Sequence, residues 1–396
     1  MLSCESVSAQ WYIFPGKKKK APKTEQVRAE TPAADTVAVL TEEVPTDTVE
    51  TFPDIWQPVF PDTWKVTLIL PLQASSEKPN SNFLEMYGGA LMALKEAGAG
   101  RDIELTVLDE SDRTTPVTES LLEESHLVIG PVKYSNISNA LMLNPEGRFI
   151  VSPLEPKAAA LADSCRVIQA PSTWKRQTDD LVSWLYEDTG LLDEVIVLRD
   201  SVHGAAGEQS AYLISKIKEK GIKFRTEQRT YELNPSKTGT TRILIASDRD
   251  SYINGAVRDL SVLASQKQSD IVLYANPKVR GSLGVDIEHL HNLRTHYTGG
   301  YFIDYDDPAT KEFIISYREF FHTEPGQFAF QGYDTMHYFL GILLKYGTEW
   351  NKKLPEYSER GLQTSYHFVD SDTVGKVNEA VRRVILEKDS SSTSVK

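Results

Sequence analysis

Polar side chains follow several apolar runs in the second half of this sequence, where they could bind a small polar ligand. Asp200-Ser201 and Ser247-Asp248 come directly after VIVLR and ILIA, and Asn276 follows IVLYA. A carboxylate, a hydroxyl and an amide can each hydrogen-bond a polar solute. The same residue types also cap helices and close turns, and capping is the alternative interpretation. The ligand-binding interpretation selects Ser201, Asp248 and Asn276.

Two further clusters have the residue types of a metal site but not its spacing. The acidic run at 304–307 lacks the glycine and the distal glutamate of a calcium loop. The histidines within 289–296 do not share one helical face, and no cysteine accompanies them. The sequence also lacks G-x-S-x-G, P-loop, H-E-x-x-H and strand-associated G-x-G-x-x-G patterns, and no histidine lies near Cys165. We therefore predict no catalytic residue, no metal and no cofactor, and we keep Asp304 as a ligand-binding candidate near an expected crossover.

The elements that must position these residues alternate between strand and helix. Residues 65–156 are predicted to run as strand, helix, strand, helix, strand, helix, strand. The first strand, 66–70, is continuously apolar, which is typical of a parallel strand covered by helices on both faces. Gly88-Gly89 lies inside the next helix and predicts close packing of that helix on the sheet. This alternation predicts an open parallel sheet, which binds ligands outside the carboxyl ends of its strands.

A second α/β unit follows the first. Buried strands are predicted at 195–198, 243–246 and 271–274, with helices between them, and no close sequence repeat relates the two units. Two more helices are predicted near 313–321 and 336–344. The sequence thus predicts two successive parallel-sheet units joined by extended crossovers.

The charge and hydropathy of the chain exclude two classes of partner. The formal net charge is −13 over 396 residues, so no basic face is expected for nucleic acid. No apolar run approaches the ~18 residues of a membrane span. The expected partners are therefore small molecules or proteins.

The two ends of the chain are predicted to lie outside the folded body. Val7-Ser8-Ala9 before Gln10 fits a secretory cleavage pattern, so residues 1–9 are interpreted as the remnant of a signal peptide. Alternatively, Leu2-Ser3-Cys4 is a degenerate lipobox with a lipid anchor on Cys4, or the chain is cytoplasmic. Residues 10–63, rich in Pro, Thr and Glu, are predicted to be a disordered linker, and 389–396 a disordered tail.

Several segments resemble the type I periplasmic-binding-protein fold. VTLILPL with FLEMYGGALMALKEAG is similar to the opening of that family, and LVIGPVKYSN to its third strand and the loop after it. FIVSPLEP resembles its strand and Ser-Pro segment, and FHTEPGQFAFQGYDTMHYFLGILLKYG its late helix pair. The resemblance covers about residues 64–385. It extends to branched-chain amino-acid receptors and, through the LILPL opening, to lipoprotein activators of peptidoglycan synthases.

The resemblance also implies binding residues in the first unit. In amino-acid-binding relatives, donors after the third and fourth strands hold the ligand carboxylate, and those loops here contain Tyr134-Ser135 and Leu154-Glu155. Ser135 fits a donor role. Glu155 stands where a hydroxyl is expected, and two carboxylates about 4 Å apart repel by roughly 4 kcal/mol at an effective dielectric of about 20. An ordinary α-amino-acid ligand is therefore disfavoured.

The resemblance implies two lobes, formed by 64–170 plus 304–348 and by 171–303 plus 349–388. They would close on a ligand by hinge bending near Ala170-Pro171 and Asp304. We expect an exported, non-enzymatic solute-binding or receptor-like protein of the periplasm or cell envelope, with a small polar ligand or an envelope protein as partner. The alternative is a scaffold or regulator of peptidoglycan synthesis that binds no small molecule.

Overall fold

A computed structural model describes residues 59–97, 99–110, 117–143, 147–200, 207–236, 238–267 and 270–395. The sequence predictions for residues 1–9, for Cys4 and for the linker as far as residue 58 lie outside this range. Ser201 also lies outside it.

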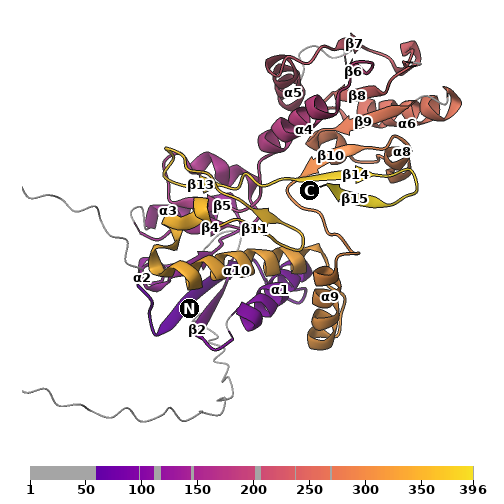
Figure 1. The fold of residues 1–396 in the computed structure, drawn as a ribbon. Helices are drawn as coiled ribbons and strands as arrows, with labels where there is room; N and C mark the ends of the chain where they lie inside the picture. Colours follow the sequence, from indigo (N-terminus) through magenta and orange to yellow (C-terminus); the bar gives the residue numbers. More distant parts are fainter. Residues whose placement is uncertain are drawn as a thin grey trace, which may run out of the picture. The chain divides into compact units, whose positions relative to one another are not determined.

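The first sheet is formed by six strands of the described chain, all of them parallel (Figure 1). Across the sheet they are β13 (Lys376–Val377), β5 (Val167–Gln169), β4 (Ile150–Ser152), β3 (Leu127–Ile129), β1 (Thr63–Leu70) and β2 (Asp102–Asp109). Val66 of β1 pairs with Leu127 on one side and Leu105 on the other. Both neighbours of β1 are therefore parallel, as the continuous apolar run of this strand predicts.

Helices cover both faces of this sheet. They are α1 (Ser81–Ala97), α2 (Glu119–Glu124), α3 (Tyr134–Leu143), α10 (Gln327–Tyr346) and the 3₁₀ segments η1 (Pro156–Leu161) and η3 (Gly347–Glu356), whereas α9 (Pro308–Phe321) packs on α1 and α10. Val66, Leu68 and Leu70 share a core with α1 and α10, whereas Ile69 shares one with α3 and η1. Alternate residues of β1 thus face opposite layers, because successive side chains of a strand point to opposite faces.

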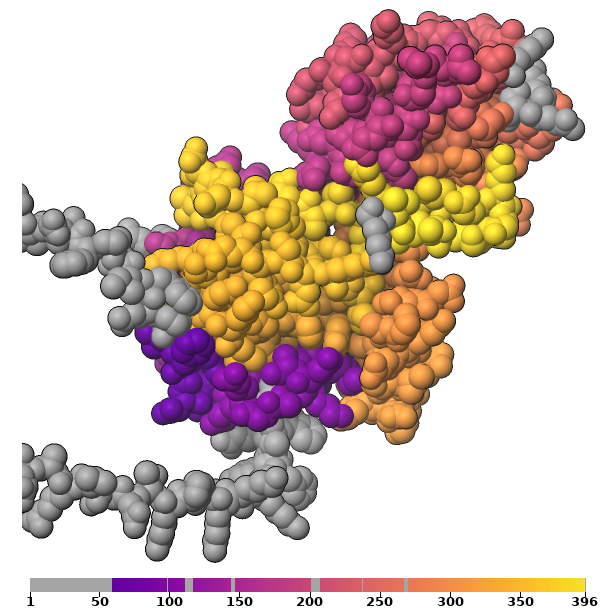
Figure 2. Space-filling view, in the orientation of Figure 1, coloured from indigo at the N-terminus to yellow at the C-terminus, as the bar shows by residue number. Residues whose placement is uncertain are grey.

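Helix α1 packs directly against α10, although the whole second unit separates them in the sequence. Figure 2 shows the purple N-terminal residues beside the orange and yellow residues that come much later in the chain. A Cβ added to Gly89 would lie 1.8 Å from the carbonyl oxygen of Ala329, and one added to Gly332 would lie 1.9 Å from that of Met86. The glycines at 88–89 therefore serve a helix–helix contact at Gly89, which corrects the predicted helix–sheet role.

The second sheet is formed by seven described strands, mostly parallel (Figure 1). Across the sheet they are β15 (Ser392–Val395), β14 (Arg382–Leu386), β10 (His296–Gly299), β9 (Ile271–Ala275), β8 (Thr241–Ala246), β6 (Glu194–Arg199) and β7 (Arg225–Glu227). β14 is antiparallel to both of its neighbours. The predicted fold class, α/β with two mainly parallel sheets, is confirmed.

Helices also cover both faces of the second sheet. They are α4 (Trp174–Asp188), α5 (Glu208–Glu219), α6 (Asp250–Lys267), α7 (Pro277–Arg280), α8 (Ile287–Asn292) and the 3₁₀ turn η2 (Thr230–Glu232). Ile243 and Ile245 of β8 share a core with α6, α7 and α8, whereas Leu244 and Ala246 share one with α4 and α5.

Three predicted boundaries are corrected. Residues 349–377 belong to the first unit, because Trp350, Leu354 and Phe368 lie in its core and β13 extends its sheet. This segment also contains a two-strand hairpin, β11 (Glu359–Arg360) with β12 (Ser365–Tyr366). Residues 59–63, placed in the linker, join the first unit through the Val59 carbonyl, which accepts from the Thr348 N–H. Residues 392–395 of the predicted tail form β15.

Candidate functional site

Three segments of the chain cross between the two sheets, and each leaves the carboxyl end of a strand in one sheet. Residues 170–173 lead from β5 to α4, 300–307 from β10 to α9, and 378–381 from β13 to β14. The first two are the crossovers expected from the sequence. The third was not expected there, because residues 349–388 were all assigned to the second unit.

Asn378 joins the third crossover to the first. It is fully buried, and its Nδ2 donates to the carbonyl oxygens of Ala170 (2.7 Å) and Ser365 (2.8 Å). Its Oδ1 accepts from the N–H groups of His367 and Ala380. All four hydrogen-bonding positions of this amide are therefore used to hold the crossovers.

Arg382 joins the third crossover to the second. Its guanidinium donates to the carbonyl oxygens of Phe302 and Gly361, and burial lowers its pKa to about 10. The loop that contains Gly361 is held in turn by Asp334, the aspartate of the GYDTM segment. The Asp334 carboxylate accepts from three consecutive backbone N–H groups, 362–364, at 2.6–2.7 Å. Sequence reasoning selected neither Asn378 nor Arg382, since their partners are distant in the chain.

Several buried polar atoms near these crossovers have no hydrogen-bond partner within the described chain. Ser152 and Gln169 end the adjacent strands β4 and β5, and their Oγ and Oε1 atoms are unpaired. The Oε1 atoms of Gln177, in the first turn of α4, and of Gln363, in the loop held by Asp334, are also unpaired. Buried polar atoms are nearly always hydrogen-bonded, so partners from outside the chain, water or a ligand, are expected here.

The candidates of the first unit lie at the carboxyl ends of β3 and β4. Tyr134 and Ser135 begin α3 and are exposed. Leu154 packs partly against the core. The Glu155 carboxylate accepts from the Lys157 N–H at 3.0 Å and caps η1. That bond gives Glu155 a local capping role.

Glu110 is a buried carboxylate that sequence reasoning did not select. It follows β2 and accepts from the Val132 N–H (2.8 Å) and from Asn136 Nδ2 (2.6 Å). Burial raises its pKa, and its hydrogen bonds to Asn136 and Val132 oppose that shift. Glu110 thus fixes the start of α3, which presents Tyr134 and Ser135. Its sequence signal was an acid directly after a strand, the same signal that selected other candidates.

The described candidates of the second unit also have local partners. Asp248 accepts from the Gln209 and Ser210 N–H groups at the start of α5. Asn276 caps α7, since its Oδ1 accepts from the Val279 N–H at 2.9 Å. Asp304 closes a turn by accepting from the Asp306 N–H. Their role toward a ligand stays a prediction.

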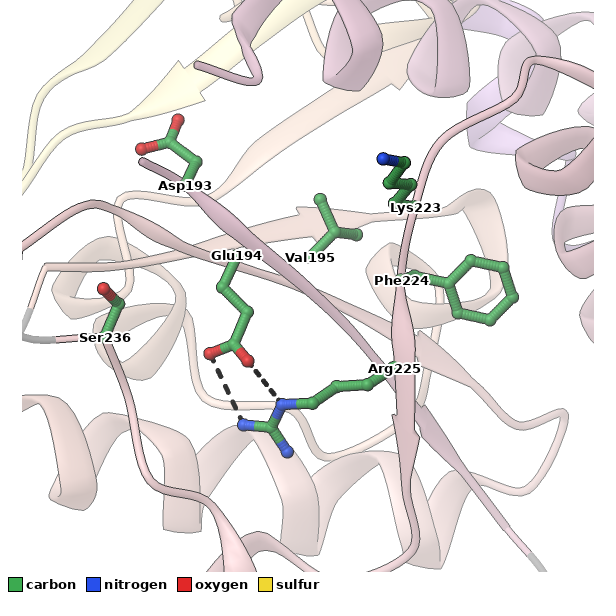
Figure 3. Close-up of a pocket in the computed structure, with 7 residues that line it drawn as sticks. All are labelled: Asp193, Glu194, Val195, Lys223, Phe224, Arg225 and Ser236. Carbon is green, nitrogen blue, oxygen red and sulfur yellow. Dashed lines mark hydrogen bonds and ion pairs between the residues drawn. The ribbon is translucent and has the colours of Figure 1, made fainter. Parts of the chain in front are cut away.

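A shallow surface pocket lies at the opposite, amino-terminal edge of the second sheet. Figure 3 shows its lining, which consists of Asp193, Glu194, Val195, Lys223, Phe224, Arg225 and Ser236. Its volume is about 480 Å³. Arg225 is paired with both Glu194 and Glu227, so its charge is already neutralised. This pocket lies away from the strand ends where the fold places ligands.

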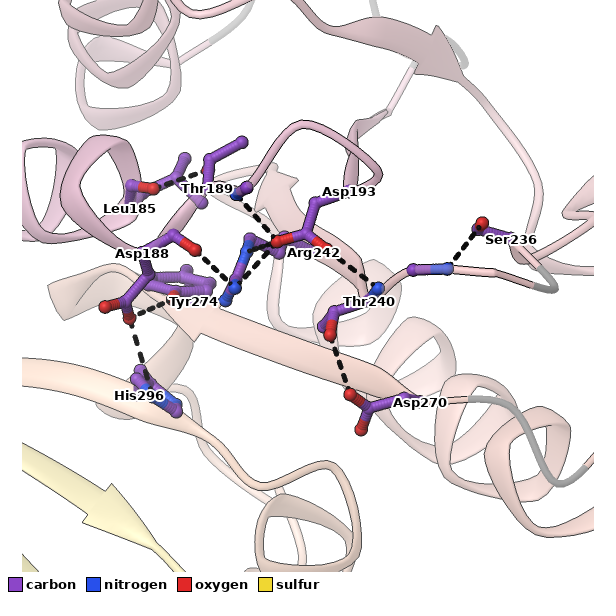
Figure 4. A network of polar contacts seen from close by, with 12 residues as sticks. Leu185, Asp188, Thr189, Asp193, Ser236, Thr240, Arg242, Asp270, Tyr274 and His296 are labelled. Carbon is purple, nitrogen blue, oxygen red and sulfur yellow. Dashed lines mark hydrogen bonds and ion pairs between the residues drawn. The ribbon is translucent and has the colours of Figure 1, made fainter.

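A polar network beside that pocket stabilises the second sheet. Arg242 donates to Asp193 and to the carbonyl oxygen of Asp188, and the Tyr274 hydroxyl donates to the Asp188 carboxylate (Figure 4). His296 lies 3.8 Å from Asp188, and burial lowers the pKa of this histidine to about 4. His296 is therefore neutral near pH 7 and acts as a core residue.

The described residues have neither a cluster of metal ligands nor a membrane-spanning helix. They contain no group of three or more His, Cys, Asp or Glu side chains able to hold a metal ion. Among them, no helix is long and apolar enough to cross a bilayer.

The fold is shared with solved structures of transport proteins. A protein described as a branched-chain amino acid ABC transporter from Rhodospirillum rubrum is 13% identical, with a TM-score of 0.58 over 84% of this chain and 100% of that one. An ABC-type branched-chain amino acid transporter from Rhodopseudomonas palustris is 12% identical, with a TM-score of 0.54 over 83% and 94%. An ABC transporter substrate-binding protein from Desulfitobacterium hafniense is 14% identical, with a TM-score of 0.50 over 84% and 100%. No family model and no curated sequence matches the chain. The comparison establishes the type I periplasmic-binding-protein fold.

Proposed function

We propose that this protein is a non-enzymatic solute-binding or receptor-like protein that holds a small polar ligand at the carboxyl ends of its two sheets. The observation that carries the proposal is the three-segment crossover, in which Asn378 and Arg382 tie the segments together. A connection of this kind suits hinge bending between two rigid units. The relatives described as transporter and substrate-binding proteins support the same conclusion.

The unpaired polar atoms of Ser152, Gln169, Gln177 and Gln363 support a ligand or ordered water beside the crossovers. Tyr134, Ser135, Asp248, Asn276 and Asp304 remain candidates at the rims, with Leu154 and Glu155. A ligand that touches both units stabilises the closed arrangement by its differential affinity for that state. A partner protein can then bind the closed state selectively.

We further propose that the protein is exported and acts in the periplasm or cell envelope. The support is the kind of protein that shares the fold, together with the secretory pattern at residues 7–9. N-terminal sequencing of protein produced from its native upstream region tests export. A mature chain that still begins at Met1 contradicts it.

A ligand screen tests the binding proposal. Native mass spectrometry of gently purified protein is followed by thermal unfolding with amino acids, sugars, organic acids and muropeptides. A ligand at 100 times its Kd adds about 2.7 kcal/mol of stability. For a chain of this size, that corresponds to a Tm increase of about 3 to 4 °C. Absence of any bound mass and of any shift would favour a scaffold or a regulator of peptidoglycan synthesis without a small-molecule ligand.

A further inference from the structure

Arg280 contacts two tyrosine rings near the carboxyl edge of the second sheet. It ends the short helix α7, which follows β9. Its guanidinium carbon is 5.4 Å from the ring centroid of Tyr297 in β10 and 5.4 Å from that of Tyr301, two residues beyond β10. Cation–π contacts of this length hold a guanidinium in place without neutralising its charge.

Gly299 makes room for this arrangement. Tyr297 and Gly299 are two residues apart in β10, so they share one face of that strand. A Cβ on Gly299 would lie 2.8 Å from Arg280 Nη1. The guanidinium therefore occupies the space that a side chain at 299 would fill.

The charge of Arg280 has no carboxylate partner within the described chain. Several other arginines of the second unit do have one: Arg242 pairs with Asp193, Arg249 with Asp200 and Arg383 with Asp180. No hydrogen bond or ion pair to the Arg280 guanidinium exists among the residues that the structure describes, and the side chain is half-buried. The net charge of the chain is −13, so an unpaired guanidinium is a locally positive site on an otherwise acidic protein.

The two tyrosine hydroxyls can add donors to the same place. Neither hydroxyl has a hydrogen-bond partner in the described part of the chain, and Tyr301 is 49% exposed. Burial raises the pKa of Tyr297, so its hydroxyl keeps its proton at neutral pH and remains a donor. The cluster therefore offers a planar cation and phenolic donors beside β10.

We propose that Arg280, flanked by Tyr297 and Tyr301, binds the carboxylate of a small organic acid. The inference deepens the proposed function, on which it rests, by naming the ligand class and the unit that holds its charge. The planar fork of arginine matches a carboxylate in a bidentate pair, which a lysine cannot reproduce. The ring faces beside the guanidinium suit an apolar or aromatic body on the same molecule.

The test uses matched probes on the full-length protein. Benzoate, butyrate, succinate and leucine are titrated by calorimetry, with benzamide, butyramide and succinamide as neutral counterparts and inorganic phosphate as a second anion. At least one carboxylate is expected to bind and its amide is not. Arg280→Gln should weaken that binding about 10- to 100-fold, and Arg280→Lys should restore only part of it.

Two further variants separate positioning from folding. Gly299→Ala retains the charge but pushes the guanidinium aside, so it should weaken carboxylate binding while the Tm of the free protein changes little. Gly255→Ala in α6, where an added Cβ meets nothing within 4 Å, is the matched control for the glycine change. Arg101→Gln, which changes an exposed arginine just before β2 at the amino end of that strand, is the control for loss of one charge.

Each outcome supports or overturns the carboxylate assignment, the proposed solute-binding function, or both. A carboxylate whose affinity depends on Arg280 and Gly299, but not on Arg101 or Gly255, supports both. Binding of a neutral solute, or binding that Arg280→Gln leaves unchanged, overturns the carboxylate assignment and leaves the solute-binding function in place. Binding of phosphate alone through Arg280 also overturns it. No binding of any probe, and no mass copurifying with the protein, overturns both.

Discussion

Replacement of Gly89 by alanine should destabilise the first unit far more than an ordinary glycine-to-alanine change in a helix. The new Cβ would lie 1.8 Å from the carbonyl oxygen of Ala329, whereas carbon and oxygen ordinarily approach to about 3.3 Å. Helices α1 and α10 must therefore separate by about 1.5 Å. The obstructing atom belongs to a helix backbone, so no side chain can rotate away.

The expected loss follows from two opposing effects. Alanine favours a helix by about 1 kcal/mol over glycine. Overpacking of a core costs typically 1–3 kcal/mol and sometimes more, and separated helices also lose dispersion contacts. Because the obstructing atom is backbone, the cost lies at or above the upper end of this range, so we expect a net decrease in the free energy of unfolding of about 2 kcal/mol or more, and a Tm lower by about 3 °C or more.

Urea denaturation followed by tryptophan fluorescence measures this decrease, with Gly255→Ala as the control. An alanine at 255 meets nothing within 4 Å, so that variant should be as stable as the wild type or up to about 1 kcal/mol more stable. A Gly89→Ala protein whose unfolding midpoint equals that of Gly255→Ala would refute the helix–helix contact as the reason for the glycine.

Three other changes have expected results. Burial raises the pKa of Asp334 to about 6, above its unfolded value, so the folded state binds a proton that the unfolded state releases. Stability should therefore fall as the pH rises from about 4 to about 6, and Asp334→Asn should remove that component from the urea midpoints. The hydrogen bond to Glu359 raises the pKa of His337, so its contribution is complete below about pH 6.5 and is lost as the pH rises through the folded pKa; a His337→Gln protein whose midpoints at pH 6 and pH 8 differ as much as those of the wild type would contradict this. Asn378→Ala removes the side-chain bonds between crossovers and should lower the free energy of unfolding by about 2 to 4 kcal/mol, whereas the exposed Asn139→Ala control should change it by less than about 0.5 kcal/mol.

The central strands β1 and β8 were predictable because each is long enough to carry an apolar pattern. The continuous apolar runs at 66–70 and 243–246 predict strands with helices on both faces, and the core contacts of these strands confirm that prediction. The third crossover was missed because β13 contains only Lys376 and Val377. Two residues are too few to show the alternation of a strand in the sequence. β13 is recognised as a strand only through its pairing with β5.

The site was less predictable than the sheets for a chemical reason. An aspartate or asparagine after a strand looks the same in the sequence whether it caps a helix or binds a ligand, and Asp248 and Asn276 cap helices. Arg280 gave no signal, because Tyr297 and Tyr301 are 17 and 21 positions away in the chain. Only the pairing of β9 with β10 brings the three together.

The discontinuity of the first unit has a consequence for synthesis on the ribosome. When residues up to the end of β5 have emerged, the sheet face formed by Val66, Leu68 and Leu70 still lacks α10, which begins at Gln327. A chain elongating at about 5–20 residues per second needs roughly 8 to 30 seconds to supply it. During that interval the second unit is made and can fold, while the first remains a nascent intermediate with an exposed apolar face. Aggregation during expression should therefore begin at this face, and binding of a chaperone there would suppress it.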